Sequence, residues 1–218
     1  MNKPLILIGS GGHAAVLLDI LIQQARTVIA VVSPDESLSR EIFSGLLHLK
    51  SDTEVLNYSP DSIELVNGIG SLPMDDNALS QRVKLFRSFT EKGYKFATIV
   101  SADAIVSKYA SLGEGAQILP RALIHTGTSI ARNTIVNSAA VIEHDCVIGA
   151  HNHIAPGAVL SGAVRTGDYV HIGTGACVIQ GIEVGTNSVI GAGATVLKDT
   201  AEKTITYPAR CLVKRKPI

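Results

Sequence analysis

Aromatic residues and cysteine are scarce in this chain, and tryptophan is absent. Aromatic residues make up 4% of the sequence although 46% of it is hydrophobic. We therefore expect a core built from small and branched aliphatic side chains. The three cysteines, Cys146, Cys177 and Cys211, are an odd number and lack the spacing of a zinc site. They are typical of reduced thiols in a cytoplasmic protein, and we expect no bound metal.

The chain also lacks an excess of charge of either sign and any long apolar run. Nineteen basic residues balance nineteen acidic ones, so a nucleic-acid partner is not indicated. No apolar run approaches the roughly 18 residues that a membrane-spanning helix needs, so we expect no membrane insertion. A length of 218 residues fits one large domain or two small ones.

The first 98 residues alternate short apolar runs with stretches of helical length. The expected strands cover residues 5–8, 28–32 and 62–66, and the expected helices cover 14–24 and 76–92. Such alternation predicts a parallel sheet with crossover helices. We interpret residues 1–98 as a small Rossmann-like domain.

From residue 99 onward the hydrophobic pattern has a period of six. Counting by sixes from Val100 to Val196 gives 17 positions, of which 16 are aliphatic and one is Thr166. The residue four places after each is mostly small. This pattern predicts a parallel β-helix of hexapeptide repeats over residues 99–200, followed by a C-terminal tail over 201–218. Three hexapeptides form one triangular coil, so residues 18 apart should stack.

The stretch from Gly9 to Ala14 reads GSGGHA and lies between an expected strand and an expected helix. It fits a phosphate-binding glycine turn, and a ligand-free tight turn is the alternative. Too little chain precedes the β-helix for a whole dinucleotide fold, so a nucleoside diphosphate is favoured over NAD. A second glycine turn, residues 67–71, should face the same crevice. Arg82 and Arg87 are plausible phosphate partners, although a solvated helix face is the commoner position for such residues.

Three of the seven histidines lie between residues 143 and 153. His144 is flanked by Glu143 and Asp145, and either carboxylate could fix its tautomer and leave the other ring nitrogen as a base. Acyl transfer needs such a base. A metal site built from His144, His151 and His153 is disfavoured, because these side chains would leave different faces of one prism. Surface positions are expected for His48 in the first domain and for His125, His151 and His171 in the β-helix.

Three motifs carry a resemblance to a known family: GSGGHAAVLLDIL at 9–21, NSAAVIEHDCVIG at 137–149 and HIAPGAVLSG at 153–162. With the hexapeptides, they make the chain resemble hexapeptide-repeat acyltransferases that join a nucleotide-binding α/β domain to a left-handed β-helix. This branch includes bacterial N-acetyltransferases for nucleotide-linked 4-amino-4,6-dideoxy sugars, as in bacillosamine and perosamine synthesis. It also includes the so-called sialic acid O-acetyltransferases.

The resemblance implies a homotrimer with active sites between adjacent prisms, and acetyl-CoA as co-substrate. It makes His144 the general base and Asp145 its orienting acid. It implies a coenzyme A groove near His153, Gly162, Gly173, Thr174, Ala192 and Gly193. It implies a nucleotide-sugar site at Gly9, Ser10, Gly11, Gly12, His13, Ser33, Asp35, Gly68, Gly70 and Asn137. Relatives often place an acid where Ser33 stands, and here Asp35 follows two residues later.

The expected activity is acetyl transfer to the 4-amino group of a nucleotide-linked amino sugar in bacterial surface-glycan synthesis. An O-acetyltransferase for sialic-acid-like sugars keeps the chemistry and changes the nucleophile. A non-catalytic nucleotide-sugar-binding trimer is the alternative of another class. The motifs name neither the sugar nor the nucleotide base.

Overall fold

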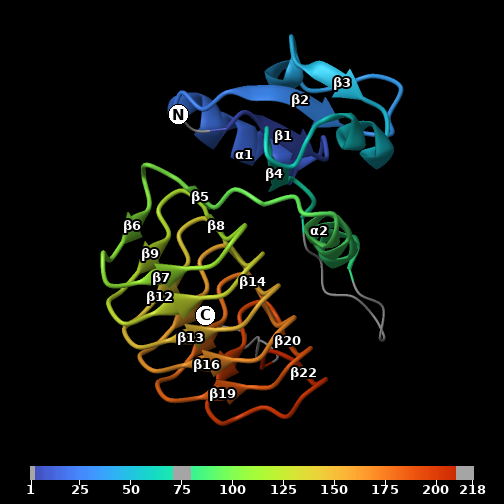
Figure 1. Ribbon diagram of the computed structural model, residues 1–218. Coiled ribbons are helices and arrows are strands. Elements are labelled where there is room, and N and C mark those ends of the chain that lie inside the picture. Colours follow the sequence, from blue (N-terminus) through green and yellow to red (C-terminus); the bar gives the residue numbers. More distant parts are fainter. Residues whose placement is uncertain (1–2, 71–79, 210–218) are drawn as a thin grey trace, which may run out of the picture.

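The computed structural model describes residues 3–70 and 80–209. A small α/β unit lies at one end of a slender parallel β-helix (Figure 1). The chain passes from the first to the second through α2, which lies alongside the upper coils.

The α/β unit contains a four-stranded parallel sheet with the order β3-β2-β1-β4. Its strands are β1 (Leu5–Ile8), β2 (Val28–Val32), β3 (Leu47–Leu49) and β4 (Glu64–Asn67). Its helices are α1 (Gly12–Gln23) and α2 (Gln81–Glu91), with the 3₁₀ helices η1 (Glu41–Phe43) and η2 (Asp52–Asn57). The core residues of α1 and of α2 pack in separate clusters that share the sheet between them.

The predicted strands at 5–8 and 28–32 are confirmed, and the third strand lies about two residues later than predicted. Helix α1 begins two residues earlier, because the glycine turn itself supplies its first residue. Helix α2 begins at Gln81 and is capped by the Ser80 hydroxyl, which accepts from the Val83 N–H. Residues 76–79 of the predicted helix lie outside the described residues. Strand β3 was not predicted, because three residues carry too little periodicity.

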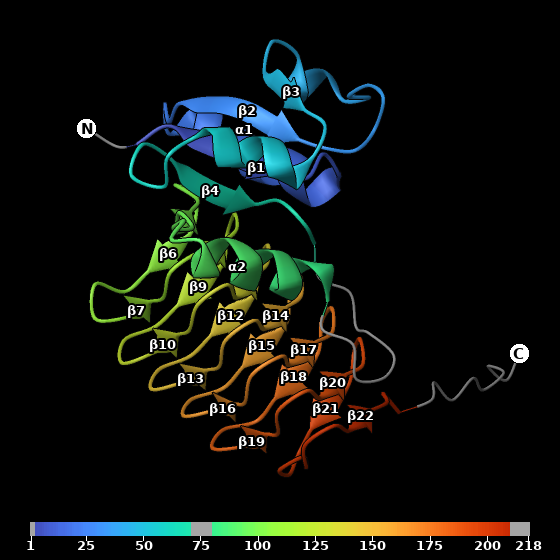
Figure 2. The ribbon, with the colours of Figure 1, turned by 45° about the vertical axis from the view of Figure 1, so that its right-hand side comes forward.

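The β-helix has two-residue strands in three sheets, which we call faces 1, 2 and 3 in the order in which the chain visits them (Figure 2). Face 1 holds β5 (Ile99–Val100), β8 (Gln117–Ile118), β11 (Ile135–Val136), β14 (His153–Ile154), β17 (His171–Ile172), β20 (Val189–Ile190) and β22 (Ile205–Thr206). Face 2 holds β6 (Ile105–Val106), β9 (Leu123–Ile124), β12 (Val141–Ile142), β15 (Val159–Leu160), β18 (Cys177–Val178) and β21 (Thr195–Val196). Face 3 holds β7 (Ser111–Leu112), β10 (Ser129–Ile130), β13 (Val147–Ile148), β16 (Arg165–Thr166) and β19 (Glu183–Val184).

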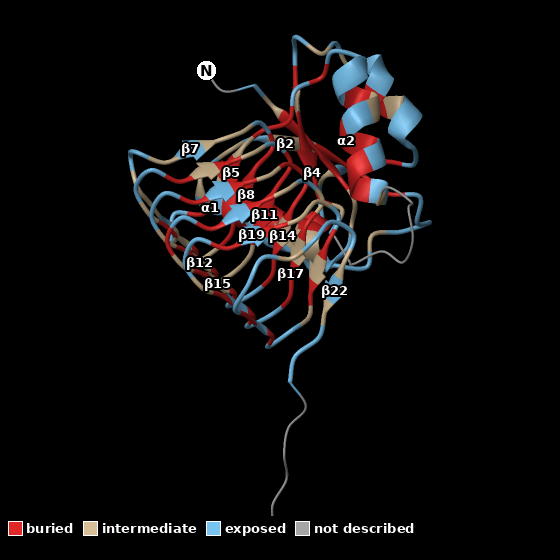
Figure 3. Ribbon diagram, turned by 90° about the horizontal axis from the view of Figure 1, so that it is seen from below, coloured by how far each residue is buried: buried red, intermediate tan, exposed pale blue. Residues whose placement is uncertain are grey.

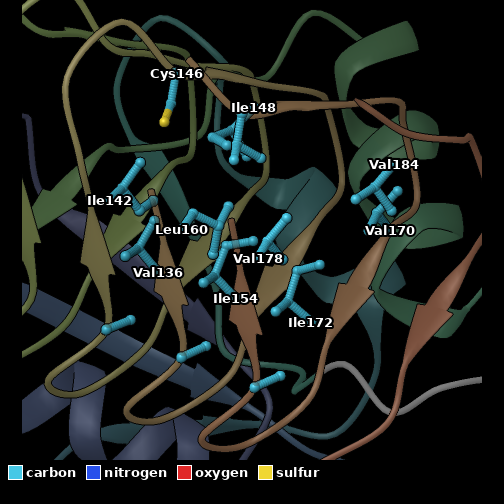
Figure 4. Close-up of a cluster of buried hydrophobic side chains, with 14 of the residues drawn as sticks. Val136, Ile142, Cys146, Ile148, Ile154, Leu160, Val170, Ile172, Val178 and Val184 are labelled. Carbon is cyan, nitrogen blue, oxygen red and sulfur yellow. The ribbon is translucent and has the colours of Figure 1, made fainter. Parts of the chain in front are cut away.

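The predicted stacking of residues 18 apart is confirmed, as in the pairing of Ile135 with His153. The last described turn is shorter, since Val189 pairs with Ile205. From β5 to β21 the second residue of each strand points into the prism, and Figure 4 shows several of these side chains together. Thr166, the one polar member of the series, accepts hydrogen bonds from the Gly149 N–H and from Asn152 Nδ2. Its hydroxyl is therefore satisfied inside an aliphatic core.

The α/β unit covers the upper part of face 1, where Ile135 and Gln117 are almost fully buried. Helix α2 covers the corner that holds His151, so the prediction of a surface position for this histidine is wrong. His151 is 6% exposed, stacks on the Tyr169 ring at 5.2 Å between centroids and meets Phe86 edge-on. In Figure 3 the buried residues line both the inside of the coil and one side of α2.

Candidate active site

A histidine–aspartate pair lies at the corner between face 2 and face 3, in the turn from β12 to β13. Nδ1 of His144 donates to Oδ2 of Asp145 over 2.8 Å, and both side chains are more than half exposed. The neighbouring acid, Glu143, lies instead 3.6 Å from Nε2 of His125. Asp145 is therefore the carboxylate on the His144 ring. A proton held on Nδ1 leaves the lone pair of Nε2 free to accept another.

Two glycines make room for this pair. Gly162 lies one coil after His144, and a Cβ atom there would sit 2.6 Å from Nε2 of the imidazole. Gly127 lies one coil before Asp145, and a Cβ atom there would overlap the Asp145 carboxylate. The pair thus occupies a slot between stacked glycine corners. Gly127 was not predicted, although counting back 18 residues from Asp145 reaches it.

A second histidine cluster lies on face 1. Asn137 Nδ2 donates to Nε2 of His153 over 3.1 Å, and the His171 ring meets His153 edge-on at 4.9 Å between centroids. Burial, and then the neighbouring His153, lowers the pKa of His171 to about 4. His171 is therefore neutral at pH 7. It is partly buried, whereas a surface position was predicted for it.

His13 joins this cluster from the first turn of α1. Its Nε2–H donates to Oε1 of Gln117 over 2.8 Å, and Gln117 Nε2 in turn donates to the Asn67 carbonyl. Burial, followed by the charge of Arg82, lowers the pKa of His13 to about 4. Gln117 was missed in the sequence, where a single glutamine on an outward position carries no signal.

The two clusters lie on opposite sides of the same prism. Each coil runs from face 1 to face 2 to face 3, and the corner between faces 2 and 3 is the one that faces away from face 1. His144 occupies that corner, whereas His153 lies on face 1. A single chain therefore does not bring these two predicted site residues together.

The first glycine turn lies at the carboxyl ends of β1 and β4. Gly9 has φ 108°, and a Cβ atom on it would press on the Gly68 backbone. Gly68 in turn has no room for a side chain, because its Cβ would lie 2.7 Å from the Ile8 carbonyl oxygen. A Cβ atom on Gly11 would meet nothing within 4 Å. Gly11 and Gly12, the first residue of α1, are both exposed. Gly9 and Gly68 thus let the two glycine turns approach closely, and Gly11 and Gly12 leave the start of α1 exposed.

Three predicted polar residues meet beside this turn. The hydroxyls of Ser33 and Ser10 donate to Oδ2 of Asp35 over 2.8 and 3.0 Å, and these hydrogen bonds lower the pKa of the Asp35 carboxyl. Asp35 thus stays ionised beside the first glycine turn. Its loop is held by two residues that the sequence did not single out, since His48 donates to the Ser33 carbonyl and Lys50 to that of Asp35.

The remaining predicted cofactor residues gather at the corner between face 1 and face 2. A Cβ on Gly173 would lie 2.5 Å from the Ala192 nitrogen, and the Thr174 carbonyl accepts from the Gly193 N–H at 2.9 Å. These four residues stack on one another. A Cβ on Gly70, in the second glycine turn, would lie 3.7 Å from His13 Cβ in the first turn of α1.

Within the described residues, no group of three or more histidine, cysteine, aspartate or glutamate side chains is placed to hold a metal ion. No helix in this part of the chain is long and apolar enough to cross a membrane.

Family comparisons match both parts of the chain. The PglD N-terminal domain family matches residues 4–83. Two hexapeptide families match the β-helix: bacterial transferase hexapeptide (six repeats) at 127–162, and hexapeptide repeat of succinyl-transferase at 164–198.

The chain is also similar to characterised relatives. It is 29% identical to GDP-perosamine N-acetyltransferase of Escherichia coli O157:H7 over 162 residues, covering 72% of this chain and 70% of the relative. PerB of Caulobacter crescentus, solved in complex with CoA and GDP-perosamine, is 29% identical, with a TM-score of 0.82 and 93% of each chain covered. The acetyltransferase domain of PglB from Neisseria gonorrhoeae is 30% identical, with a TM-score of 0.80 and coverage of 97% and 100%. The chain therefore belongs to the hexapeptide-repeat nucleotide-amino-sugar acetyltransferase family, with its Rossmann-like N-terminal domain and left-handed parallel β-helix.

Proposed function

We propose that this protein transfers the acetyl group of acetyl-CoA to the 4-amino group of a nucleotide-linked 4-amino-4,6-dideoxy sugar in bacterial surface-glycan synthesis. The observation that carries the proposal is the 2.8 Å contact between His144 and Asp145 in a slot between two glycines. The names of the E. coli and C. crescentus relatives supply the substrate class.

The reaction is a direct acyl transfer. The sugar amine attacks the thioester carbonyl, so a C–N bond forms and the C–S bond breaks. Nε2 of His144 takes the proton that the amine loses and returns it to the departing CoA thiolate. Asp145 holds the ring through Nδ1 and stabilises the transient imidazolium. No acyl-enzyme is needed.

Each substrate has its own part of the molecule in this proposal. Residues 1–98 bind the nucleotide, with its phosphates at Gly11 and Gly12 and its ribose or base near Ser33 and Asp35. Residues 99–200 bind acetyl-CoA along the stacked corner that contains Gly173 and Gly193, with the thioester beside His153.

We propose a homotrimer whose active site is completed by two chains. His144 and His153 lie on opposite sides of one prism, so a site that uses both must take them from neighbouring copies. Face 2 supports this assembly, because its outward column is mainly apolar, whereas that of face 3 is mainly polar. The face 2 column begins Ile105, Leu123, Val141 and Val159, and the face 3 column includes Ser111, Ser129, Arg165 and Glu183. We place the enzyme in the cytoplasm, where free thiols such as Cys146 and Cys177 persist.

The test is a substrate panel with a base-deficient control. UDP-, GDP- and dTDP-linked 4-amino sugars are each incubated with acetyl-CoA, and release of the CoA thiol is followed. We expect one nucleotide sugar to support turnover in wild type and to lose it in His144→Ala. Turnover only with a hydroxyl acceptor would assign an O-acetyltransferase. Binding of nucleotide sugar without thiol release from any acceptor would assign a non-catalytic protein.

A further inference from the structure

Arg82, in the first turn of α2, is the largest fully buried side chain of the described residues. It is 2% exposed, so neither a solvated position nor a direct phosphate contact, the two positions considered from the sequence, describes it. No carboxylate of the described residues pairs with it. A buried cation without a counter-ion is costly unless its N–H groups are hydrogen-bonded.

The side-chain hydrogen bonds of Arg82 go to backbone carbonyls on both sides of the junction between the α/β unit and the β-helix. Nη1 donates to the carbonyls of Asn67 and Ile69 over 2.9 and 2.8 Å. Nε and Nη2 share the Asn133 carbonyl over 3.4 Å. The guanidinium therefore ties the second glycine turn, which begins at Asn67, to a corner of the β-helix.

A second set of contacts reinforces this tie. The Asn67 side chain donates to the Arg82 carbonyl and to Oδ1 of Asn133, and its own carbonyl also accepts from Gln117. Asn133 is fully buried at φ 54° and donates to Nδ1 of His151. The turn at 67–70 is consequently fixed relative to the β-helix and not only relative to its own sheet.

The charge of Arg82 also acts on the proposed phosphate site. Burial lowers the pKa of Arg82 to about 9, so the side chain remains a cation at pH 7. After burial, its charge has the largest effect on the pKa of His13, which lies in the first turn of α1 beside Gly12. An anion bound at the N-terminus of α1 would feel the same positive potential.

We infer that Arg82 is a positioning residue of the nucleotide site: it fixes the turn at 67–70 against the β-helix and stabilises the bound diphosphate through space. The inference rests on the proposed nucleotide site. Arg82 has a geometric role, because it binds three carbonyls and so holds the turn in place. It also has an electrostatic role, because its buried charge has no counter-ion among the described residues.

Two substitutions separate these parts. Arg82→Met removes the charge and the hydrogen bonds, whereas Arg82→Lys keeps the charge and loses the branched donors. Lys84→Met is the matched control, because Lys84 is an exposed cation on the same helix. Asn133→Gly keeps the Asn133 carbonyl, tolerates the positive φ and removes the side-chain amide, which accepts from Asn67 and donates to His151. It provides a readout even if Arg82→Met fails to fold.

The measurement is the Kd of UDP, GDP and dTDP by calorimetry on the full chain, followed by the KM values for nucleotide sugar and acetyl-CoA. For the nucleotide that wild type binds, we expect Arg82→Met to raise Kd by about tenfold or more. We expect Arg82→Lys and Asn133→Gly to raise it by about threefold and Lys84→Met to leave it within about twofold. The KM for acetyl-CoA should stay unchanged in all four.

Several results would overturn the inference. They are an unchanged Kd in Arg82→Met, equal effects on the two KM values, or no binding of any nucleoside diphosphate by wild type. If Arg82→Met does not fold, an unchanged Kd in both Arg82→Lys and Asn133→Gly overturns it. Failure of the proposed function is distinguishable, because wild type would then bind a diphosphate, with the expected dependence on Arg82, but acetylate no amino sugar.

Discussion

The histidines at the outer corner of the prism differ from those at the junction between the α/β unit and the β-helix. His144 is more than half exposed, and its partner Asp145 is the next residue in the chain. His13 and His151 are covered by other elements, and their partners Gln117 and Asn133 lie 104 and 18 residues away. The exposed histidine is free to exchange protons with a substrate. The junction histidines are held neutral by burial and join two parts of the fold.

The largest expected effect is a loss of activity on substitution of the exposed histidine, His144. His144→Ala should lower kcat by about 10²–10⁴-fold, because a positioned base contributes that much. Its melting temperature should remain that of wild type, since the side chain packs into no core. Asp145→Asn should cost less, because an amide still accepts the Nδ1–H bond but does not stabilise the imidazolium. Steady-state kinetics measures kcat, and thermal melts followed by circular dichroism measure the melting temperature of both variants. A kcat near that of wild type in His144→Ala would show that the pair has no catalytic role.

The next effect tests whether the glycine slot positions the imidazole. A methyl group at Gly162 would lie 2.6 Å from the His144 ring, so Gly162→Ala should displace it and lower kcat by about tenfold or more. Gln180→Ala, one coil further at the same corner and exposed, is the control and should retain wild-type kcat. Equal kcat values for the two variants would show that the ring does not depend on the slot.

Most of the β-helix could be predicted from the sequence, because its packing rule repeats locally. One aliphatic residue every six positions sets the coil, and adjacency alone puts Asp145 within reach of His144. The junction could not be predicted in the same way. The burial of His151 depends on α2, whose Phe86 packs on that corner beside Tyr169 of the next coil. Arg82 is buried because three distant carbonyls meet there. No local pattern encodes such contacts.

The two glycine turns should respond differently to substitution, one in nucleotide binding and the other in stability. Gly11→Val should raise the KM for nucleotide sugar by about tenfold without loss of stability, because its position is open to solvent and free of contacts. Gly68→Val should instead lower the melting temperature, because its side chain would meet the Ile8 carbonyl and Ala14. Thermal melts and kinetics on both variants make the check. An unchanged KM in Gly11→Val would remove that turn from the nucleotide site.

A smaller effect should separate the two histidine classes by pH. Burial lowers the pKa of His151 from 6.5 to about 4, so the unfolded chain binds more protons between these values. Stability is therefore full above pH 6.5 and is lost as pH falls toward 4. At pH 5 the titration of His151 lowers the free energy of unfolding by up to about 2 kcal/mol. His151→Gln should flatten the fall in melting temperature between pH 7 and 5, whereas His125→Gln, on the exposed surface, should not. Identical pH slopes in the two variants would count against a neutral, structural His151.

Subunit complementation tests most directly the claim that two chains complete one active site. His144→Ala and His153→Ala chains, each with its own tag, are assayed alone at limiting acetyl-CoA and then after mixed refolding. If each site takes His144 from one copy and His153 from its neighbour, random trimers should regain about one quarter of the wild-type sites. If both histidines of a site come from the same chain, every site keeps a defect. Activity in the mixture no higher than that of the separate variants would contradict the shared site.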